Sequence, residues 1–168
     1  SKLIMLTAHR RENLGEPMKH MFRAVKRVLN EYDDVKVIYP IHKNPLVRET
    51  AAEIFGDTER IQIIEPLDVL DFHNFMNHSY MILTDSGGVQ EEAPSLGKPV
   101  LVMRDTTERP EGVAAGTLKL VGTDEETIYQ NFKMLLDDSE EYKKMSQASN
   151  PYGNGDASKQ IVRILRGI

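Results

Sequence analysis

The fold is decided by the stretch Ile82-Leu83-Thr84-Asp85-Ser86-Gly87-Gly88-Val89-Gln90-Glu91-Glu92-Ala93. Residues 80–83 form a short apolar run that predicts a β-strand. Ser86 suits the N-cap of a helix that follows, and the two glycines lack Cβ atoms that would shield the backbone N–H groups. Because these N–H groups and the helix dipole attract negative charge, the turn predicts a binding site for an anion such as a phosphate.

Two carboxylates, Glu91 and Glu92, follow in the first turns of the predicted helix. They could do no more than complement the helix dipole. Alternatively, one of them could bind hydroxyl groups of the molecule that carries the phosphate. The turn by itself leaves both interpretations open.

Composition indicates an ordinary globular domain. The chain has 168 residues, 40% of them apolar and 28% charged, which is enough for one domain with a core. The net charge of −5 argues against a nucleic-acid-binding protein. The absence of cysteine excludes disulfides and cysteine–zinc sites and fits a cytoplasmic protein. No apolar run is long enough for a bilayer, so no membrane partner is expected.

Apolar runs alternate with helical patterns along the whole chain. Strands are expected over residues 2–7, 35–39, 61–64, 80–84, 99–103 and 118–121, and helices over 17–32, 45–55, 68–78, 87–96 and 123–137, with two more capped by Ser139 and Asp156. Residues 104–116 are expected to form a long polar loop. Strands that are apolar throughout and alternate with helices predict an α/β domain whose mostly parallel sheet has helices on both faces.

The helix starts carry recognisable capping residues. Asn44 is expected to cap the second helix, with Pro45 in its first turn. Thr123 is expected to cap the helix that ends near residue 137, with Glu126 placed for a capping box.

Four loops that follow strands, residues 8–15, 41–44, 86–88 and 104–116, should lie at one edge of the sheet. Ligands of such sheets bind at the carboxyl ends of the strands. The first loop holds His9, Arg10 and Arg11, which suit contacts to phosphate, and His9 could also transfer protons near neutral pH. The alternative is a solvated loop with weak surface ion pairs.

The other candidates at this edge have plain alternatives. His42 alone would be read as an exposed or turn-capping histidine, and Phe72 as a core residue that could instead stack on a base. Arg109 lies in the long fourth loop, whose length and place favour a ligand contact. His20, His73 and His78 show no metal-ligand spacing and are read as structural, so no metal site is expected.

The residues alone therefore predict an α/β domain that binds an anionic, phosphorylated ligand, and a diphosphate joined to a ribose and a base would use these features well. They do not determine a reaction. The chain has no dinucleotide-binding glycine fingerprint, no Walker loop and no nucleophile elbow.

Four motifs occur together in one order. They are Thr7-Ala8-His9-Arg10-Arg11-Glu12-Asn13, Pro40-Ile41-His42-Lys43-Asn44-Pro45, residues 83–94 with the Ser-Gly-Gly turn, and Arg104-Asp105-Thr106-Thr107-Glu108-Arg109-Pro110-Glu111. This combination resembles the non-hydrolysing UDP-N-acetylglucosamine 2-epimerases of bacteria. The resemblance covers most of the chain but only the C-terminal half of that family.

The resemblance implies a fold and a domain organisation. The family has two Rossmann-like domains around a cleft, which is the GT-B architecture. Residues 1–168 would be its C-terminal, UDP-binding domain, and the N-terminal catalytic domain would be absent. The chain begins at Ser1-Lys2 and enters a strand at once, so we expect a domain excised from a longer protein.

The resemblance also implies an activity. The family interconverts UDP-N-acetylglucosamine and UDP-N-acetylmannosamine by eliminating UDP and adding it back with C2 inverted, and it needs no cofactor. The carboxylates that move the proton belong to the missing domain. We therefore expect the isolated chain to fold but to be inactive, and the full-length protein to be a cytoplasmic homodimer.

Residue by residue, the resemblance places His9 at the diphosphate, where it assists departure of the leaving group. It assigns the phosphates to Ser86, Gly87 and Gly88, and the ribose hydroxyls to Glu92.

Four further positions match the family. Arg109 would lie near the phosphates and the sugar, and Phe72 in the uracil-binding region. Arg10 and His42 match a second, allosteric UDP-N-acetylglucosamine site that activates bacterial members.

Three rival interpretations remain open. A GT-B glycosyltransferase C-terminal domain would share the architecture, although the His-Arg-Arg-Glu-Asn loop argues against it. A hydrolysing 2-epimerase would release free N-acetylmannosamine, and this half of the protein does not separate the two branches. The third is a non-enzymatic domain that only binds UDP, or nothing.

Overall fold

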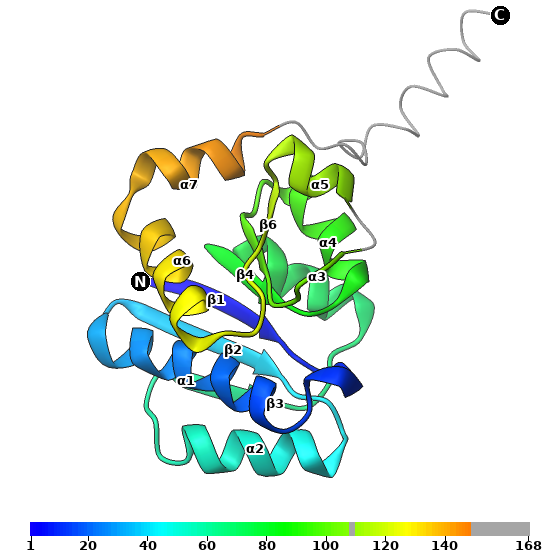
Figure 1. Cartoon of the computed structure of the whole chain (residues 1–168), viewed down its shortest axis with the longest axis vertical. Helices are drawn as coiled ribbons and strands as arrows, with labels where there is room; N and C mark the ends of the chain where they lie inside the picture. The colour runs from blue at the N-terminus through cyan, green and yellow to red at the C-terminus, as the bar shows by residue number, and fades with distance from the viewer. Residues whose placement is uncertain (108–109, 149–168) are drawn as a thin grey trace, which may run out of the picture.

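The computed structural model describes residues 1–107 and 110–148 (Figure 1). In chain order the elements are β1 (Lys2–Thr7), the 3-10 helix η1 (Arg11–Asn13), α1 (Glu16–Glu31), β2 (Val35–Pro40), α2 (Pro45–Phe55), β3 (Ile61–Ile64), α3 (Val69–His78), β4 (Met81–Thr84), α4 (Gly87–Glu92), the 3-10 helix η2 (Ala93–Leu96), β5 (Val100–Val102), α5 (Pro110–Ala115), β6 (Leu118–Leu120), α6 (Glu125–Asp137) and α7 (Ser139–Ser146). The six strands that the sequence predicts are all present.

The strands form one parallel sheet in the order β3-β2-β1-β4-β5-β6. From β1 the chain adds β2 and then β3 on one side of the sheet. It then crosses back through α3 to β4 and adds β5 and β6 on the other side. The strand order therefore reverses between β1 and β4. Doubly wound sheets of this kind bind ligands at such a reversal, beyond the carboxyl ends of the two strands.

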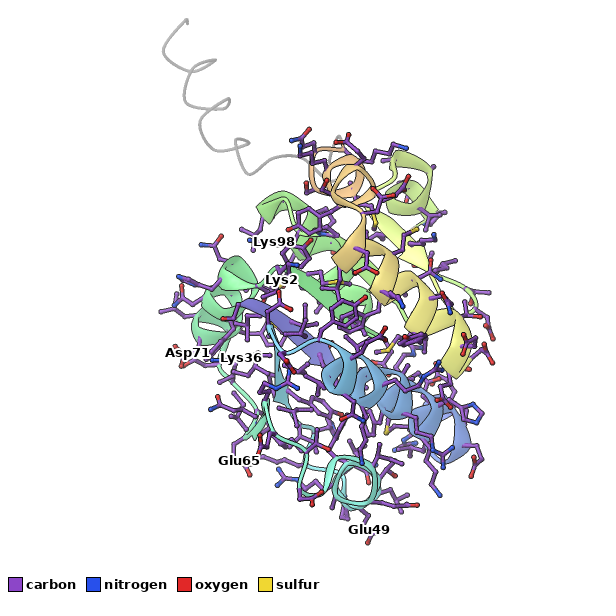
Figure 2. The ribbon with its side chains drawn as sticks, turned by 90° about the vertical axis from the view of Figure 1, so that its left-hand side faces the viewer. Lys2, Lys36, Glu49, Glu65, Asp71 and Lys98 are labelled. Carbon is purple, nitrogen blue, oxygen red and sulfur yellow. The ribbon has the colours of Figure 1, made fainter. Side chains whose placement is uncertain are left out.

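Helices cover both faces of the sheet, as predicted. Successive strand residues point to opposite faces, so Ile4 and Leu6 of β1 join the larger core beneath α1, α2 and α6, whereas Met5 joins the smaller core beneath α3 and α4. Figure 2 shows α1, α2 and α6 on one side of the strands and α3 on the other, with the labelled Glu49 of α2 and Asp71 of α3 at the outside. The predicted α/β class, with its Rossmann-like sheet, is confirmed.

The helix caps agree with the sequence prediction at α2 but not at α6 and α7, where an aspartate takes the place of the predicted threonine or serine. The Asn44 side chain accepts a hydrogen bond from the Leu46 N–H at 2.9 Å, which confirms the predicted cap of α2. The cap of α6 is Asp124 rather than Thr123, because the Asp124 carboxylate accepts hydrogen bonds from both the amide and the hydroxyl of Thr127.

Asp138 likewise caps α7, so Ser139 is its first helical residue. Asp156 lies outside the described residues.

Two other predictions about regular structure were wrong in part. The expected polar loop over residues 104–116 contains α5, which begins at Pro110, a residue that favours the first turn of a helix. The expected helix over residues 87–96 divides into α4 and η2, with Pro94 in the first turn of the second segment. A proline there cannot donate the hydrogen bond that would continue an α-helix.

Within the described residues, no helix is both long enough and apolar enough to cross a membrane.

Candidate functional site

A pocket of about 320 Å³ lies beyond the carboxyl ends of the strands on both sides of the reversal in strand order. This volume is at the lower end of the range for small-molecule sites. Among the residues that the structure describes, the loops 8–15, 41–44 and 86–88 contribute to it. The pocket is lined by Thr7, His9, Pro40, Ile41, His42, Pro66, Leu67, Phe72, Ser86, Gly88, Val89 and Glu92.

The base of the pocket is built where β1 and β4 end side by side. Their last residues, Thr7 and Thr84, are paired in the sheet, and their buried hydroxyls are hydrogen-bonded at 2.6 Å. The Thr84 hydroxyl oxygen also accepts the Ser86 N–H at 2.8 Å. The turn after β4 is therefore tied to the strand that precedes it, and its backbone enters α4 in a fixed direction.

Asp85 joins the two loops that follow these strands. Its side chain is fully buried, and its carboxylate accepts hydrogen bonds from the backbone N–H groups of His9 and Arg10 and from the Asn13 side chain, at 3.0–3.2 Å. Asp85 was not among the site residues predicted from the sequence. The feature that could have indicated its role is its place directly after an apolar strand, where a buried carboxylate needs hydrogen-bond donors.

His9 and His42 lie next to each other, although 33 positions separate them in the sequence. Their rings are stacked with centroids 5.8 Å apart and an interplanar angle of 27°. Both side chains line the pocket, and both residues are exposed. The His42 Nδ1 atom accepts the Asn44 N–H at 3.1 Å, so His42 caps its turn, as its plain interpretation held, and also faces the site.

Ser86 occupies the N-cap position of α4, as predicted, but its side chain makes no capping hydrogen bond. Its hydroxyl is therefore not used to begin the helix. Ser86 and Gly88 line the pocket, whereas Gly87, the first residue of α4, is not among the lining residues.

Glu92 lines the pocket and pairs with His73 across the contact between α3 and the end of α4. The His73 Nε2 and a Glu92 carboxylate oxygen are 3.1 Å apart, and both side chains are a little under half exposed. The sequence interpretation of His73 as a structural residue did not foresee this pair. Nothing in the spacing of the two residues indicates it, because the contact depends on where α3 crosses the sheet.

Phe72 combines the two roles that the sequence left as alternatives. Its side chain is half-buried and packs against the smaller core, and it also lines the pocket. Pro66 and Leu67 also line the pocket. These side chains give the pocket an apolar wall.

Arg10 is not among the pocket-lining residues. Its Nε donates to the Glu12 carboxylate at 2.5 Å. A backbone hydrogen bond at Glu12 itself and then this contact with Arg10 hold the pKa of the Glu12 carboxyl below its usual value. The predicted Arg109 contact lies outside the described residues.

The fourth loop reaches the site through α4. The Thr107 hydroxyl donates to the side-chain oxygen of Gln90, and the buried Gln90 amide donates to the Ser86 carbonyl at 3.2 Å. Residues 104–107 are thereby connected to the turn after β4. Among the residues that the structure describes, no group of three or more histidine, aspartate or glutamate side chains could hold a metal ion.

A doubly wound sheet with a pocket at its reversal point defines a Rossmann-like ligand-binding domain. The pocket lining combines two imidazoles, a serine hydroxyl, a carboxylate and an apolar wall. The sequence profile of the UDP-N-acetylglucosamine 2-epimerase family matches residues 1–166. The chain belongs to this family.

Curated and solved relatives agree with that assignment. The chain is 70% identical over 164 residues to the UDP-N-acetylglucosamine 2-epimerase of Bacillus subtilis, covering 98% of this chain and 43% of the relative. The Staphylococcus aureus MnaA–UDP co-structure is 60% identical with a TM-score of 0.91, covering 99% of this chain and 46% of that one. The Neisseria meningitidis UDP-GlcNAc 2-epimerase bound to UDP-GlcNAc is 48% identical with a TM-score of 0.90, covering 100% and 45%.

The chain thus spans less than half the length of the relatives that it matches. A C-terminal domain of a glycosyl transferase group 1 family protein from Francisella tularensis has a TM-score of 0.70 at 18% identity, a likeness that concerns the fold alone. The predicted fold, one Rossmann-like half of a GT-B architecture, is confirmed.

Proposed function

We propose that this chain is the UDP-binding half of an epimerase that interconverts UDP-N-acetylglucosamine and UDP-N-acetylmannosamine. The observation that carries the proposal is the pocket at the strand reversal, which is lined by His9 from the loop after β1 and by Ser86 and Glu92 from the turn and helix after β4. Support comes from relatives of the same fold whose structures hold UDP or UDP-GlcNAc.

The proposed reaction breaks and remakes one bond at C1 and one at C2 of the sugar. A base removes the C2 proton while the C1–oxygen bond to the β-phosphate breaks, which releases UDP and leaves a 2-acetamidoglucal. UDP then adds back at C1, and C2 receives a proton on its opposite face. Sugar atoms and charge balance without an oxidant or a cofactor.

In this proposal the present chain holds the leaving group. The β-phosphate gains negative charge as the C1–oxygen bond breaks, and donors that are already in place stabilise such charge. His9 is the donor or acid at the diphosphate. The Ser86 hydroxyl and the amides of Gly87 and Gly88 bind the phosphates.

The remaining contacts fix the nucleoside and the sugar. Glu92 binds the ribose hydroxyls as a charged acceptor. Phe72 belongs to the wall that receives the uracil, and Arg109 contacts the phosphates and the sugar.

A second molecule of UDP-N-acetylglucosamine would bind beside the first and activate the enzyme through Arg10 and His42. The stacking of His42 on His9 supports this part of the proposal, because one residue is assigned to each of the two proposed sites. Binding at Arg10 would require its guanidinium to exchange Glu12 for an anionic ligand.

The rest of the enzyme would come from an N-terminal domain that supplies the proton-transferring carboxylates and closes over the pocket. The full-length protein would work in the cytoplasm as a homodimer. Its product would serve the synthesis of cell-surface polysaccharides.

Calorimetry with UDP tests the binding site. We expect the chain to bind UDP weakly, and Ser86→Ala to lower the affinity about 3- to 10-fold, as loss of one hydrogen bond does. Ser146→Ala is the matched control, since Ser146 lies in α7 and bonds only the Lys143 carbonyl among its described contacts. A chain that binds no UDP, or a Ser86→Ala variant with unchanged affinity, would contradict the proposed site.

A product assay tests the reaction. The isolated chain should be folded and inactive, and the chain joined to the N-terminal domain of the family should convert UDP-N-acetylglucosamine to UDP-N-acetylmannosamine. Epimerisation by the isolated chain would refute the proposed division of labour. Release of free N-acetylmannosamine would identify the hydrolysing branch instead.

A further inference from the structure

The connection between the two pocket loops depends on one buried side chain. The sheet pairing of β1 and β4 ends at Thr7 and Thr84, and the last backbone hydrogen bond between them runs from the Asp85 N–H to the Thr7 carbonyl at 3.1 Å. Beyond this point the two chains separate into different loops. The Asp85 side chain continues the connection by accepting the N–H groups of His9 and Arg10.

The Asp85 carboxylate is fully satisfied by neutral donors. It is fully buried, and among the described residues no lysine or arginine forms an ion pair with it. A carboxylate out of water needs hydrogen bonds to offset its lost hydration, and here two backbone amides and the Asn13 amide provide them. Hydrogen bonds to a charged acceptor are stronger than those between neutral groups, so the segment that holds His9 is fixed firmly.

This arrangement also determines which groups remain for a ligand. The backbone N–H groups of His9 and Arg10 point to Asp85, and the N–H of Ser86 points to Thr84. These three amides are therefore not available to a bound anion. What the first loop offers to the pocket is the His9 side chain, whose position depends on a backbone that Asp85 holds.

We propose that Asp85 is a positioning residue: it holds the His9 loop against the turn after β4, so that His9 and Ser86 can act on one diphosphate. The role of the diphosphate rests on the proposed function. The positioning itself rests on the hydrogen bonds of Asp85 and can be tested without a ligand.

Asp85→Asn is the decisive variant. The amide has the shape of the carboxylate but offers one acceptor oxygen instead of two, and in either orientation its NH₂ group would face the His9 N–H, from which it cannot accept. We expect faster hydrogen exchange at the amides of His9 and Arg10 and a change in the ring-proton resonances of the stacked His9 and His42. Both are NMR measurements on the ligand-free chain, and both should be local.

Asp138→Asn is the matched control. Asp138 also accepts two backbone N–H groups, those of Glu140 and Glu141, at the start of α7. It should leave the exchange of His9 and Arg10 and the histidine resonances unchanged. Urea unfolding of both variants measures any general loss of stability. A general loss would also accelerate hydrogen exchange throughout the core, whereas local loosening would not.

UDP titration then tests the functional part. In Asp85→Asn we expect affinity to fall about tenfold, and the His9 ring resonances to stop responding to UDP while the Gly88 amide still responds. If the unmodified chain binds no UDP, the proposed function fails, but the exchange data still decide whether Asp85 positions the loop. Normal exchange and normal affinity in Asp85→Asn would overturn the inference.

Asn13→Ala keeps the test decisive if Asp85→Asn does not fold. It removes one donor to the carboxylate and leaves the two backbone donors in place. A positioning role predicts a smaller, local increase in exchange at His9 and Arg10 and a severalfold loss of UDP affinity. If Asp85→Asn unfolds and Asn13→Ala changes neither quantity, Asp85 is a purely structural residue and the inference is wrong.

Discussion

The α1–α6 surface and the rim of the pocket carry the same kinds of charged and aromatic side chains, but these side chains have different partners. On the α1–α6 surface, Arg27 pairs with Glu126 at 2.7 Å and Glu125 at 3.5 Å, and its guanidinium lies 3.9 Å from the centre of the Tyr129 ring. The hydrogen bond that Arg27 donates to Glu126 raises the pKa of Arg27 above its usual value. The charges of this surface are thus neutralised within the protein.

At the pocket rim, formed by the loops after β1 and β4 and by α4, buried side chains hold backbone groups. The rim also has the side-chain pairs His73–Glu92 and Arg10–Glu12. Asp85 accepts the N–H groups of the His9 loop, and Thr84 accepts that of Ser86. The side chains of His9, His42 and Ser86 are left to line the pocket. The side chains of the α1–α6 surface therefore satisfy one another, whereas buried groups beneath the pocket fix the backbone and leave the side chains of His9 and Ser86 to a ligand.

The largest expected effect is a loss of stability without a loss of binding, caused by a substitution in the core beneath the α1–α6 surface. Phe132 of α6 is fully buried in the larger core. Phe132→Ala should lower the free energy of unfolding by about 3–5 kcal/mol, because it removes a large apolar side chain and leaves a cavity. Urea unfolding measures the loss, and calorimetry on the folded protein should give an unchanged UDP affinity. A specific loss of UDP affinity would show that the two regions are not independent.

The next effect belongs to the pocket. Glu92→Ala should weaken UDP binding about 10- to 150-fold, the equivalent of about 1.5–3 kcal/mol for hydrogen bonds to a charged acceptor. Unfolding in urea should change little, because Glu92 is nearly half exposed. Glu91→Ala is the matched control, since Glu91 is its exposed neighbour in α4 and does not line the pocket. A larger loss of affinity in Glu91→Ala than in Glu92→Ala would reverse the ribose assignment.

Tyr39 of β2 is buried in the larger core, and we expect it to make the stability of the protein depend on pH. Its hydroxyl donates to the Ala8 carbonyl at 2.7 Å, next to His9. Burial, and then the charge of Asp85, raise the pKa of Tyr39 above its usual value. Tyr39→Phe should lower the free energy of unfolding by about 1–2 kcal/mol at neutral pH, because a buried carbonyl loses its donor.

The sign of the pH effect follows from the raised pKa. The folded protein keeps the Tyr39 proton to higher pH than the unfolded chain does, so this stabilisation is complete below pH ~10 and is lost as the pH rises above it. Tyr39→Phe lacks the titrating group, so the stability difference between the two proteins should shrink above pH ~10. Urea unfolding at neutral and alkaline pH checks this, and a constant difference would contradict it.

The fold could be predicted from the sequence because each strand is an apolar run and the helices between the strands have recognisable starts. It also found pocket residues that lie far apart in the chain, including His9, His42 and Ser86, because parallel strands bring their carboxyl ends to one edge. The resemblance to a family supplied the roles of these residues. The predicted roles themselves stay predictions.

The residues that sequence reasoning missed depend on tertiary contacts. Asp85 is only one more polar residue in its turn until the loop after β1 is placed beside it. The pairing of His73 with Glu92 depends on the path of α3 across the sheet. The cap of α6 moved by one residue because Asp124 and Thr123 are both good capping residues, and spacing alone does not rank them.

The smallest expected effects come from removing one arginine from the α1–α6 surface and one from the pocket rim. This pair of substitutions tests the comparison between the two regions most directly. Arg27→Met keeps an apolar stem over Tyr129 but removes the charge that Glu125 and Glu126 neutralise. We expect a small fall in the midpoint of thermal unfolding that disappears in ~1 M salt, since exposed ion pairs are weak and screened. UDP affinity should not change.

Arg10→Met is the counterpart at the pocket rim. Its exposed pair with Glu12 contributes little to stability, so the unfolding midpoint should stay the same. In the full-length enzyme it should instead reduce activation by a second molecule of UDP-N-acetylglucosamine, which steady-state kinetics at increasing substrate concentration would detect. If Arg10→Met lowered the unfolding midpoint as Arg27→Met does and left activation intact, Arg10 would stabilise the fold as Arg27 does, and the comparison of the two regions would not identify a binding site here.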